Sequence, residues 1–424
     1  MVHRLKQVVR ALLPTPAISA YHFFLAYLSA LRYRFPSRKL LVIAVTGTKG
    51  KSSTTEMLNA ILEEAGYTTA LLNSIRIKTG DDTKPNELRM SMPGRFFIQH
   101  FLHNAVVEKC TAAILEMTSE GAKQHRHRFI NLDALIFTNL APEHIESHGS
   151  YEAYANAKFE IGRELARSCK RPRSIAALSE DDESRRYLAL PVEHALPFSL
   201  SAQQPWFADQ HGGYFTFDGK KISVNLPGEF SLKNALAAAT LVRQLGIATD
   251  VIARALGRLQ RIPGRAERME EGQDYTVVVD YAHTPDSLEA LYDAYKHVRK
   301  ICVMGATGGG RDTWKRPVMG SLADTHCDHV ILTDEDPYDE DPEAIVAALS
   351  EGMKRIPEVI MDRRAAIRRG CELARAGDAV LITGKGTDPC ICGPNGSKIP
   401  WSDAEIAREE IRGIATRKGY NIRT

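Results

Sequence analysis

Residues 40–54 read LLVIAVTGTKGKSST and contain the pattern that decides the fold. The apolar run over residues 40–45 is typical of a buried parallel strand. A glycine-rich turn follows it, and a helix is predicted from Lys51 to about Gly66. Glycines let backbone N–H groups point at phosphate oxygens, and a helix N-terminus adds positive potential. A strand, this turn and a helix therefore predict a phosphate-binding loop.

The turn supplies the candidate nucleotide-binding residues. Lys51 is expected to neutralise the β- and γ-phosphates, and the Ser52 hydroxyl is expected to bind Mg²⁺. The usual pattern has a glycine five residues before Gly50, where this chain has Val45, so the loop is a variant. An ordinary glycine-rich turn is the alternative, and the flanking strand and helix argue against it. The other candidates are Gly47, Thr48, Lys49, Gly50 and Ser53.

Strands and helices alternate along the chain, which predicts an α/β fold with mainly parallel sheets covered by helices on both faces. Strands are expected at 68–72, 112–116, 134–138, 276–280, 301–304, 330–333 and 379–383, and helices at 285–298 and 342–353. The alternation breaks at 261–265 and then restarts. We predict an N-terminal helical segment (1–38), a P-loop-type ATP-binding domain (39–264) and a Rossmann-like α/β domain (265–424).

The composition excludes several classes of protein. The chain has 424 residues, of which 44% are hydrophobic and 25% charged, as in a globular protein of two or three domains. A net charge of +3 gives no support for nucleic-acid binding, which normally shows a concentrated basic face. Seven cysteines without a Cys-x-x-Cys pair argue against a disulfide framework and a structural zinc site, and favour the cytoplasm.

The N-terminal segment is basic at first and then apolar. No Asp, Glu, Lys or Arg occurs from Ala11 to Leu31, but prolines interrupt this stretch and arginines follow it, which argues against a signal peptide or a spanning helix. Thr15 and Pro16 predict a helix start, as N-cap and first helical residue. The helix either packs on the main body or lies on a membrane surface, peripherally at the inner face. Its apolar face is expected to hold Phe23, Phe24, Tyr27, Leu28 and Leu31.

Further segments resemble, in order, those of the Mur ligase superfamily. The turn at 46–53 resembles the nucleotide loop of Mur ligases and folylpolyglutamate synthases. Residues 137–149 (FTNLAPEHIESHG) resemble a family segment with Asn-Leu, Asp-His and His-Gly, and residues 280–286 (DYAHTPD) resemble the MurE-type signature Asp-Tyr-Ala-His-x-Pro. Residues 308–317 (GGGRDTWKRP) resemble Gly-Gly-x-Arg-Asp-x-x-Lys-Arg-Pro. The resemblance extends from about Leu40 to Asp403.

The resemblance implies an ATP-dependent ligase that joins a carboxylate to an amine through an acyl phosphate, acting on a muramyl-peptide-like cell-wall precursor. ATP and Mg²⁺ are the implied cofactors, and small-molecule substrates rather than nucleic acids are the implied partners. A folylpolyglutamate-synthase-like ligase is the nearest alternative. A nucleotide-dependent switch or scaffold without ligase activity is a second alternative. The oligomeric state is not predicted.

The resemblance also implies residue roles. Glu116 ends a predicted strand and is a candidate Mg²⁺ ligand beside Ser52, because Mg²⁺ prefers oxygen ligands; the family pattern adds His144. Lys158 matches a lysine that is carbamylated in MurE-type ligases, although a plain surface lysine is the alternative. Lys51, Lys158, His144 and His283 form the predicted catalytic set. The remaining predicted nucleotide contacts are Asn234, Arg265, Asp280, Tyr281 and His283.

Departures from the family concern the substrates. About forty residues precede the first strand, too few for the separate domain that binds a uridine nucleotide in MurE-type enzymes. Residues 335–338 read Glu-Asp-Pro-Tyr where diaminopimelate-adding enzymes have Asp-Asn-Pro-Arg, and Tyr338 cannot pair bidentately with a distal carboxylate. A diamine or lysine-like substrate, with acids as counter-charges, is therefore the alternative. The predicted substrate contacts are Arg311, Glu335, Asp336, Tyr338, Lys385 and Asp388.

Overall fold

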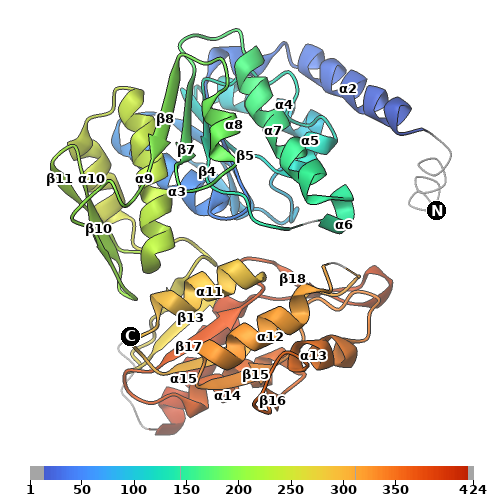
Figure 1. Cartoon of the computed structure of the whole chain (residues 1–424), viewed down its shortest axis with the longest axis vertical. Coiled ribbons are helices and arrows are strands. Elements are labelled where there is room, and N and C mark those ends of the chain that lie inside the picture. The colour runs from blue at the N-terminus through green and yellow to red at the C-terminus, as the bar shows by residue number, and fades with distance from the viewer. Residues whose placement is uncertain (1–13, 144, 311, 419–424) are drawn as a thin grey trace. The chain divides into compact units, whose positions relative to one another are not determined.

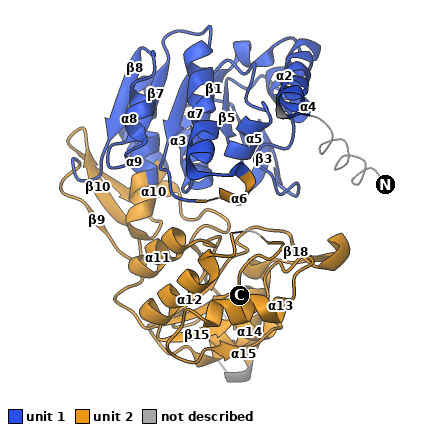
Figure 2. Ribbon diagram, turned by 45° about the vertical axis from the view of Figure 1, so that its right-hand side comes forward, with its two compact units in different colours: residues 1–142, 148–202, 234–255 blue, residues 143–147, 203–233, 256–424 orange. Residues whose placement is uncertain are grey.

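The computed structural model describes residues 14–143, 145–310 and 312–418, and the chain divides into two compact units (Figure 1). Unit 1 comprises residues 1–142, 148–202 and 234–255, and unit 2 comprises residues 143–147, 203–233 and 256–424, as coloured in Figure 2. Each unit contains its own sheet and helices, as the alternating pattern predicts. The α/β fold class is confirmed.

Unit 1 is built on an eight-stranded sheet in the order β4-β3-β2-β5-β1-β6-β7-β8. Pairing is parallel from β2 to β8, and β3 and β4 are antiparallel additions at one edge. The central strands are buried throughout, which explains why they read as continuous apolar runs. The strands are β1 (Leu41–Thr46), β2 (Thr69–Leu72), β3 (Arg76–Thr79), β4 (Asp82–Pro85), β5 (Ala112–Glu116), β6 (Ala134–Phe137), β7 (Ser174–Leu178) and β8 (His194–Phe198).

Alternate side chains of the central strands enter two cores. Val42, Ala44 and Leu115 pack in a cluster that also contains Phe101 of α4 and Ile161 of α7. α3 packs against β1, β2 and β5. The helices of this part of the chain are α3 (Lys51–Glu64), α4 (Arg95–Val107), α5 (Ser119–Lys123), α6 (Ile145–His148), α7 (Tyr151–Arg167), α8 (Ser184–Leu188), α9 (Gly228–Gln244) and α10 (Thr249–Arg258).

Unit 2 contains a six-stranded sheet in the order β12-β13-β17-β14-β15-β16, parallel except for β12. Its strands are β12 (Glu267–Met269), β13 (Thr276–Asp280), β14 (Lys300–Met304), β15 (His329–Leu332), β16 (Glu358–Val359) and β17 (Ala379–Thr383). Its helices are α11 (Pro285–Ala294), α12 (Lys315–His326), α13 (Pro342–Ser350), α14 (Arg363–Leu373) and α15 (Asp403–Lys418). Smaller sheets are formed by β9 (Phe207–Ala208), β10 (Gly213–Phe217) and β11 (Lys220–Val224), and by β18 (Cys390–Cys392) with β19 (Lys398–Pro400).

Helix α2 (Thr15–Arg32) forms as predicted, but it begins one residue earlier than expected, with Pro14 as its N-cap. It packs on α4, and the short 3-10 helix η1 (Pro36–Lys39) follows it. The helix thus packs on the body, one of the two locations left open, while most of the predicted apolar face stays exposed. Phe24 and Leu31 are exposed, whereas Ala26, Ser29 and Ala30 are buried. No helix within the described ranges has the length and apolarity needed to span a bilayer.

Cys302 and Cys327 form a disulfide, although the cysteine spacing argued against a disulfide framework. Cys302 lies on β14 and Cys327 directly follows α12. The two residues are 25 positions apart, and only the packing of this helix against the sheet brings them together. Cysteine spacing along the chain therefore carried no signal for this pair.

His127 is an unusual member of the unit 1 interior. The side chain is buried, and neither ring nitrogen has a hydrogen-bond partner. Burial, with additional repulsion from Arg128, lowers the pKa of His127 from 6.5 to about 3. The imidazole is therefore neutral in the folded protein, while the unfolded chain binds a proton near pH 6.5.

The buried His127 predicts an acid-sensitive stability. The pKa of His127 is lower in the folded protein than in the unfolded chain. The contribution of His127 to the free energy of unfolding is therefore present above pH 6.5 and is lost progressively as the pH falls towards 3. We expect this group alone to remove about 2 kcal/mol of the free energy of unfolding between pH 7 and pH 5. His127→Leu should flatten this pH dependence in chemical denaturation, and His297→Leu, at an exposed histidine, should not. An unchanged pH profile in His127→Leu would contradict the assignment.

Candidate functional site

The carboxyl ends of three neighbouring strands meet at one edge of the unit 1 sheet. Val45 of β1 pairs with Glu116 of β5, and Thr46 pairs with Phe137 of β6. The turn after β1 is therefore level with the segments that follow β5 and β6. Ligands of open parallel sheets bind at this edge.

The turn after β1 lies against the end of β6 at a distance that only glycine permits. A Cβ on Gly47 would come within 2.0 Å of Thr138 Oγ1, and a Cβ on Gly50 within 2.2 Å of Asn234 Oδ1. Both glycines have positive φ, at 142° and 80°. Asn139 holds the turn through two hydrogen bonds. Its side-chain Oδ1 accepts from the Lys49 backbone N–H at 2.9 Å, and its backbone carbonyl accepts from the Thr48 backbone N–H. The conformation of the phosphate-loop candidate is thus set by its neighbours.

Two lysines approach this turn. Lys51 Nζ donates to the Thr48 carbonyl at 2.8 Å, and Lys158 Nζ donates to the Gly47 carbonyl at 2.6 Å. Lys158 is only 2% exposed and lies 4.7 Å from the Tyr154 ring centroid. The Tyr154 hydroxyl in turn bonds with Thr48 Oγ1 at 2.8 Å. Two cationic groups at one glycine-rich turn are suited to a polyanionic ligand.

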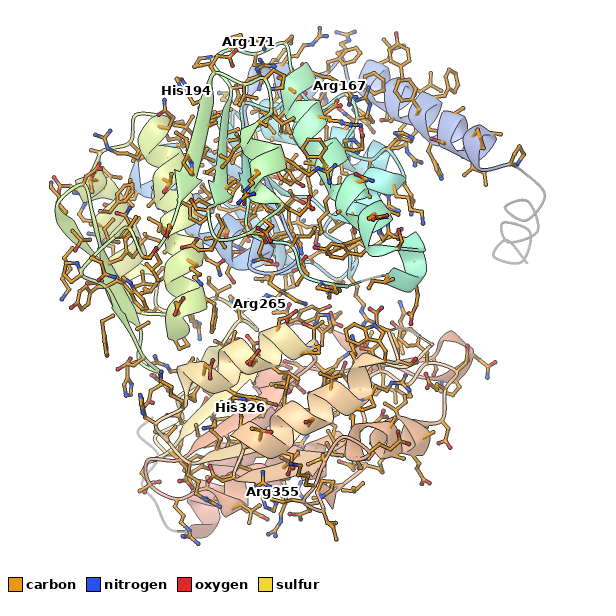
Figure 3. The ribbon with its side chains drawn as sticks, in the orientation of Figure 1. Arg167, Arg171, His194, Arg265, His326 and Arg355 are labelled. Carbon is orange, nitrogen blue, oxygen red and sulfur yellow. A yellow bond between two sulfur atoms is a disulfide. The ribbon has the colours of Figure 1, made fainter. Side chains whose placement is uncertain are left out.

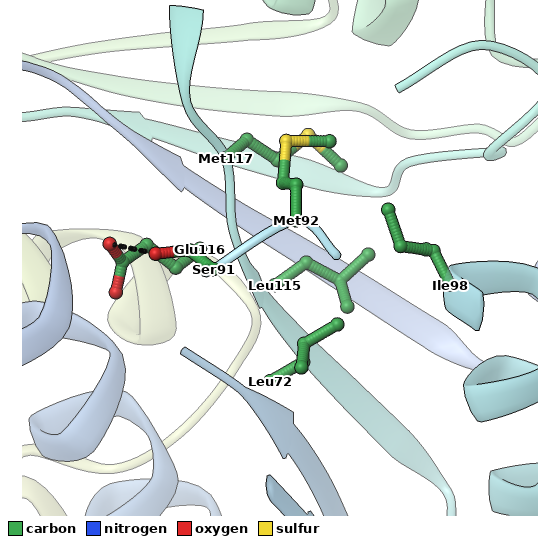
Figure 4. Close-up of a pocket in the computed structure, with 7 residues that line it drawn as sticks. All are labelled: Leu72, Ser91, Met92, Ile98, Leu115, Glu116 and Met117. Atoms are coloured by element: carbon green, nitrogen blue, oxygen red, sulfur yellow. Dashed lines mark hydrogen bonds between the residues drawn. The ribbon is translucent and has the colours of Figure 1, made fainter. Parts of the chain in front are cut away.

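Glu116 lies beside the first residues of α3. Ser52 Oγ donates to Glu116 Oε2 at 2.8 Å, and Ser91 Oγ donates to Oε1 at 2.7 Å, the bond drawn in Figure 4. Glu116 also borders a narrow apolar gap with Leu72, Ser91, Met92, Ile98, Leu115 and Met117. A carboxylate and a hydroxyl so close together fit Mg²⁺, which takes oxygen ligands and retains waters. Among the described residues, no cluster of three or more His, Cys, Asp or Glu could hold a metal, so water and phosphate would complete such a shell.

His148 belongs to a polar cluster in unit 1. Its Nε2 lies 3.2 Å from Ser119 Oγ and 3.5 Å from Glu120 Oε1. The same imidazole ring makes an edge contact with Tyr154, at 5.5 Å between centroids. Glu120 is therefore a partner of His148.

A second group of predicted residues gathers in unit 2 at the ends of β13 and β17. Asp280 accepts hydrogen bonds from the backbone N–H groups of Ala266 and Ala282, both at 2.6 Å. Burial raises the pKa of Asp280, although Arg265 opposes this shift. Arg265, labelled in Figure 3, lies 4.5 Å from the Tyr281 ring centroid. This arrangement combines a half-buried acid, a cation and an aromatic ring.

His283 extends this second group. Its Nδ1 lies 2.6 Å from the Tyr281 carbonyl, and its ring centroid lies 4.7 Å from that of Tyr281. Its Nε2 lies 3.3 Å from Glu143 Oε1, which also belongs to unit 2. The backbone and Glu143 thereby orient the imidazole.

A buried charge cluster occupies the ends of β15 and β17. Lys385 Nζ lies 2.8 Å from Asp336 Oδ2 and 3.6 Å from Asp388 Oδ2. Glu335 accepts from Thr307 Oγ1 at 2.8 Å, and its other oxygen is buried without a hydrogen-bond partner. Burial raises the pKa of Glu335. Two carboxylates thus contact the one ammonium group, and Glu335 is a third acid, next to Asp336 in the chain, which leaves an excess of acid.

Comparison with known proteins identifies the family. The Mur ligase middle domain family matches residues 45–242, and the Mur ligase glutamate ligase domain family matches residues 264–386. A UDP-N-acetylmuramyl-tripeptide synthetase of Roseiflexus is 35% identical over 431 residues, covering 94% of this chain and 84% of the relative.

The chain belongs to the Mur ligase family.

Structural comparison agrees with this assignment. A solved UDP-N-acetylmuramoyl-L-alanyl-D-glutamate–2,6-diaminopimelate ligase superposes with a TM-score of 0.60 at 27% identity, covering 88% of this chain and 79% of that one. Escherichia coli FolC in complex with ADP shares the fold, with a TM-score of 0.65 at 19% identity and 93% and 94% coverage. This Mur ligase is an enzyme that forms amide bonds at the expense of ATP, and the MurE-type interpretation is better supported than the folylpolyglutamate alternative.

The predicted site residues of this Mur ligase fall into two groups, one in each unit. Residues 47–53, Glu116, Lys158 and Asn234 gather in unit 1. Those of unit 2 are Arg265, Asp280, Tyr281, His283, Glu335, Asp336, Tyr338, Lys385 and Asp388. His144 and Arg311 lie outside the described residues.

Sequence reasoning missed the residues that support the unit 1 site. Asn139 lies within the quoted segment 137–149, and Tyr154 lies four residues before Lys158, but no role was assigned to either residue. Ser74 and Ser91 bond with the Ser52–Glu116 pair from loops that carry no recognisable motif. Only their hydrogen bonds reveal them.

The glycine contacts predict a specific loss of nucleotide binding. Gly47→Ala would drive a methyl group into Thr138, so affinity for a fluorescent ATP analogue should fall at least tenfold. Gly66→Ala is a matched control, because Gly66 also has positive φ (88°) but has open space where a Cβ would lie. That variant should lose about 1 kcal/mol of stability and keep its affinity. Equal affinities of Gly47→Ala and wild type would contradict this role of the turn.

Proposed function

We propose that ATP binds with its phosphates on residues 47–53 and that Mg²⁺ is held by Ser52 and Glu116. The observation that carries the proposal is the glycine-rich turn with Lys51 beside it, whose Nζ lies 2.8 Å from the Thr48 carbonyl oxygen. Backbone N–H groups and the α3 N-terminus add to this positive potential. When bound, Mg²⁺ would supply charge neutralisation for the β- and γ-phosphates.

The proposed reaction has two steps. A substrate carboxylate oxygen attacks the γ-phosphorus of ATP, a P–O bond forms, and ADP leaves as an acyl phosphate is made. The amine nitrogen then attacks the acyl carbon, and phosphate leaves with the C–O electron pair as the amide forms. Lys51 stabilises the charge that develops on the transferring phosphoryl group, while the turn positions it in line.

We assign Lys158 the role of a carbamylated lysine. CO₂ would add to the neutral amine with loss of a proton, and the resulting carbamate would replace an ammonium group with a negative group. Burial of Lys158 and its position at Gly47 support this role, since a carbamate there would lie close to Mg²⁺ held by Ser52 and Glu116. His144 is proposed as a further metal ligand on the basis of the family pattern alone.

Residues of unit 2 are proposed to contact the nucleotide and the amine. Asn234 of unit 1, with Arg265, Asp280, Tyr281 and His283 of unit 2, would serve the nucleotide. The charge cluster of Glu335, Asp336, Lys385 and Asp388 would serve the incoming amine, with Tyr338 and Arg311. The excess of carboxylates over Lys385 favours an amino acid with a second amino group, because a buried charge needs a counter-charge.

The proposed carboxylate substrate is a muramyl-peptide-like cell-wall precursor, which is the substrate type named for the Roseiflexus relative. We place the enzyme in the cytoplasm, where ATP is available, and peripherally at the inner membrane face. Helix α2 supports this location through its exposed apolar side chains.

Phosphate release tests the chemistry. A screen of muramyl peptides against a panel of amino acids should give release that needs both substrates, and Lys51→Ala should abolish it. Lys158→Ala should lower turnover by at least a hundredfold, and short-chain carboxylic acids should restore part of it in Lys158→Ala but not in Lys51→Ala. ATP binding without release for any substrate pair would overturn the ligase proposal. Unchanged turnover in Lys158→Ala would remove Lys158 from the site.

Amino-acid preference tests the charge cluster. Wild type should use lysine at least tenfold better, in kcat/KM, than diaminopimelate, because Tyr338 offers no cation to a distal carboxylate. Tyr338→Arg should raise the use of diaminopimelate, and Tyr338→Phe is the matched control that should not. Position 338 has a positive φ of 54°, and Tyr, Arg and Phe are all non-glycine residues that experience it alike, so backbone strain does not distinguish the variants. A wild-type preference for the distal carboxylate would refute the assignment.

A further inference from the structure

Helix α2 has two faces of different chemistry. Its inner face is fixed to unit 1 by burial of Ala26, Ser29 and Ala30 and by polar bonds. Ser19 Oγ lies 2.8 Å from His125 Nε2, and His22 Nδ1 lies 2.9 Å from Arg95 Nη2. The helix is thus held on the body in one orientation.

The outer face of α2 is apolar and accessible. Tyr21, Phe24 and Leu31 are 59%, 57% and 51% exposed, and Tyr27 is also exposed. Positions 21, 24, 27 and 31 are three or four residues apart, so these side chains form one stripe along the helix. No charged residue occurs from Ala11 to Leu31 to interrupt it. A continuous apolar stripe on a solvent-facing helix marks an interaction surface.

Basic residues lie at the C-terminal end of this stripe. Arg32, Arg34, Arg38 and Lys39 are all exposed. Residues 1–55 contain nine Lys and Arg and no Asp or Glu, and Glu56 is the first acid of the chain, although the whole chain has a net charge of only +3. Four of these nine basic residues, Arg32, Arg34, Arg38 and Lys39, directly follow the apolar stripe in the chain, and the chain after residue 55 is net negative.

We propose that the α2 surface, defined by Tyr21, Phe24, Tyr27, Leu31 and the four basic residues that follow, docks on an anionic lipid bilayer. The apolar side chains would enter the headgroup region while the arginines and Lys39 contact lipid phosphates. A second copy of the chain would bring the same positive charge to this surface, and so would residues 1–13, which contain Arg4, Lys6 and Arg10. Like charges disfavour both of these occupants, whereas anionic headgroups complement the surface.

The inference deepens the proposed peripheral location and rests on that part of the proposed function, not on the proposed chemistry. Helix α2 carries no residue assigned to nucleotide, metal or substrate. Lipid binding can therefore be measured without ATP or substrates, and its failure would be separate from failure of the ligase proposal.

Vesicle co-sedimentation of the full chain tests the proposal. The protein should sediment with vesicles of phosphatidylcholine mixed with phosphatidylglycerol, much less with phosphatidylcholine alone, and high salt should release it. Phe24→Ser with Leu31→Ser should weaken binding roughly tenfold or more. Arg32→Gln with Lys39→Gln should weaken binding to the anionic vesicles by roughly fivefold per residue.

Matched variants in unit 2 control for general loss of apolar surface and charge. Ile356→Ser with Ile399→Ser removes two side chains that are 98% and 59% exposed, and Lys354→Gln with Arg375→Gln removes two exposed charges. Both should bind vesicles as wild type does, and circular dichroism should show every variant folded. No sedimentation with anionic vesicles, or equal loss in the control variants, would overturn the proposal. The molecular mass in solution, measured by light scattering, gives a further check. If wild type were oligomeric, the α2 variants were monomeric and vesicle binding were unchanged, the occupant of the surface would be a second copy of the chain and the proposal would be overturned.

Discussion

The close approach between the Gly47–Gly50 turn and the end of β6 is the constraint on which unit 1 depends. It requires two glycines, because a Cβ at either position would overlap Thr138 or Asn234. It also requires the register in which β1 lies between β5 and β6. Once that register is set, Asn139 holds the turn, and Lys51, Lys158 and Glu116 reach one edge of the sheet. The packing of the apolar strands thus fixes where Lys51, Lys158 and Glu116 lie at the edge of the sheet.

Unit 2 uses the same edge of a parallel sheet for different chemistry. Its strand ends carry a half-buried acid, Asp280, next to a cation and an aromatic ring, and a second, acid-rich cluster around Lys385. A fully buried ion pair between Arg363 and Asp403, at 2.7 Å, ties α14 to the start of α15 beneath these loops. Arg363 also donates to the Thr383 carbonyl at the end of β17. A rigid scaffold therefore carries loops whose residues depart from the family pattern.

Helix α2 shows how one element can serve stability and docking together. Small and polar residues anchor it through a narrow inner face, which leaves the large aromatic residues outside. A helix that served packing alone would place its bulky apolar residues inward, since burying them contributes most to stability. The inverted arrangement, together with the concentration of basic residues, is the physical basis for assigning this helix to a membrane surface.

The sequence by itself determined the α/β class, most of the strands and the phosphate-loop candidate, because buried parallel strands are uninterrupted apolar runs and glycine turns have a local signature. Through its motifs it also indicated the family. Only the tertiary structure decided which face of α2 is exposed, since helical spacing defines faces but not what covers them. It alone joined Cys302 to Cys327, left the ring nitrogens of His127 without hydrogen-bond partners, and brought Ser74, Ser91 and Tyr154 to the site. These contacts join residues distant along the chain, and no local pattern specifies them.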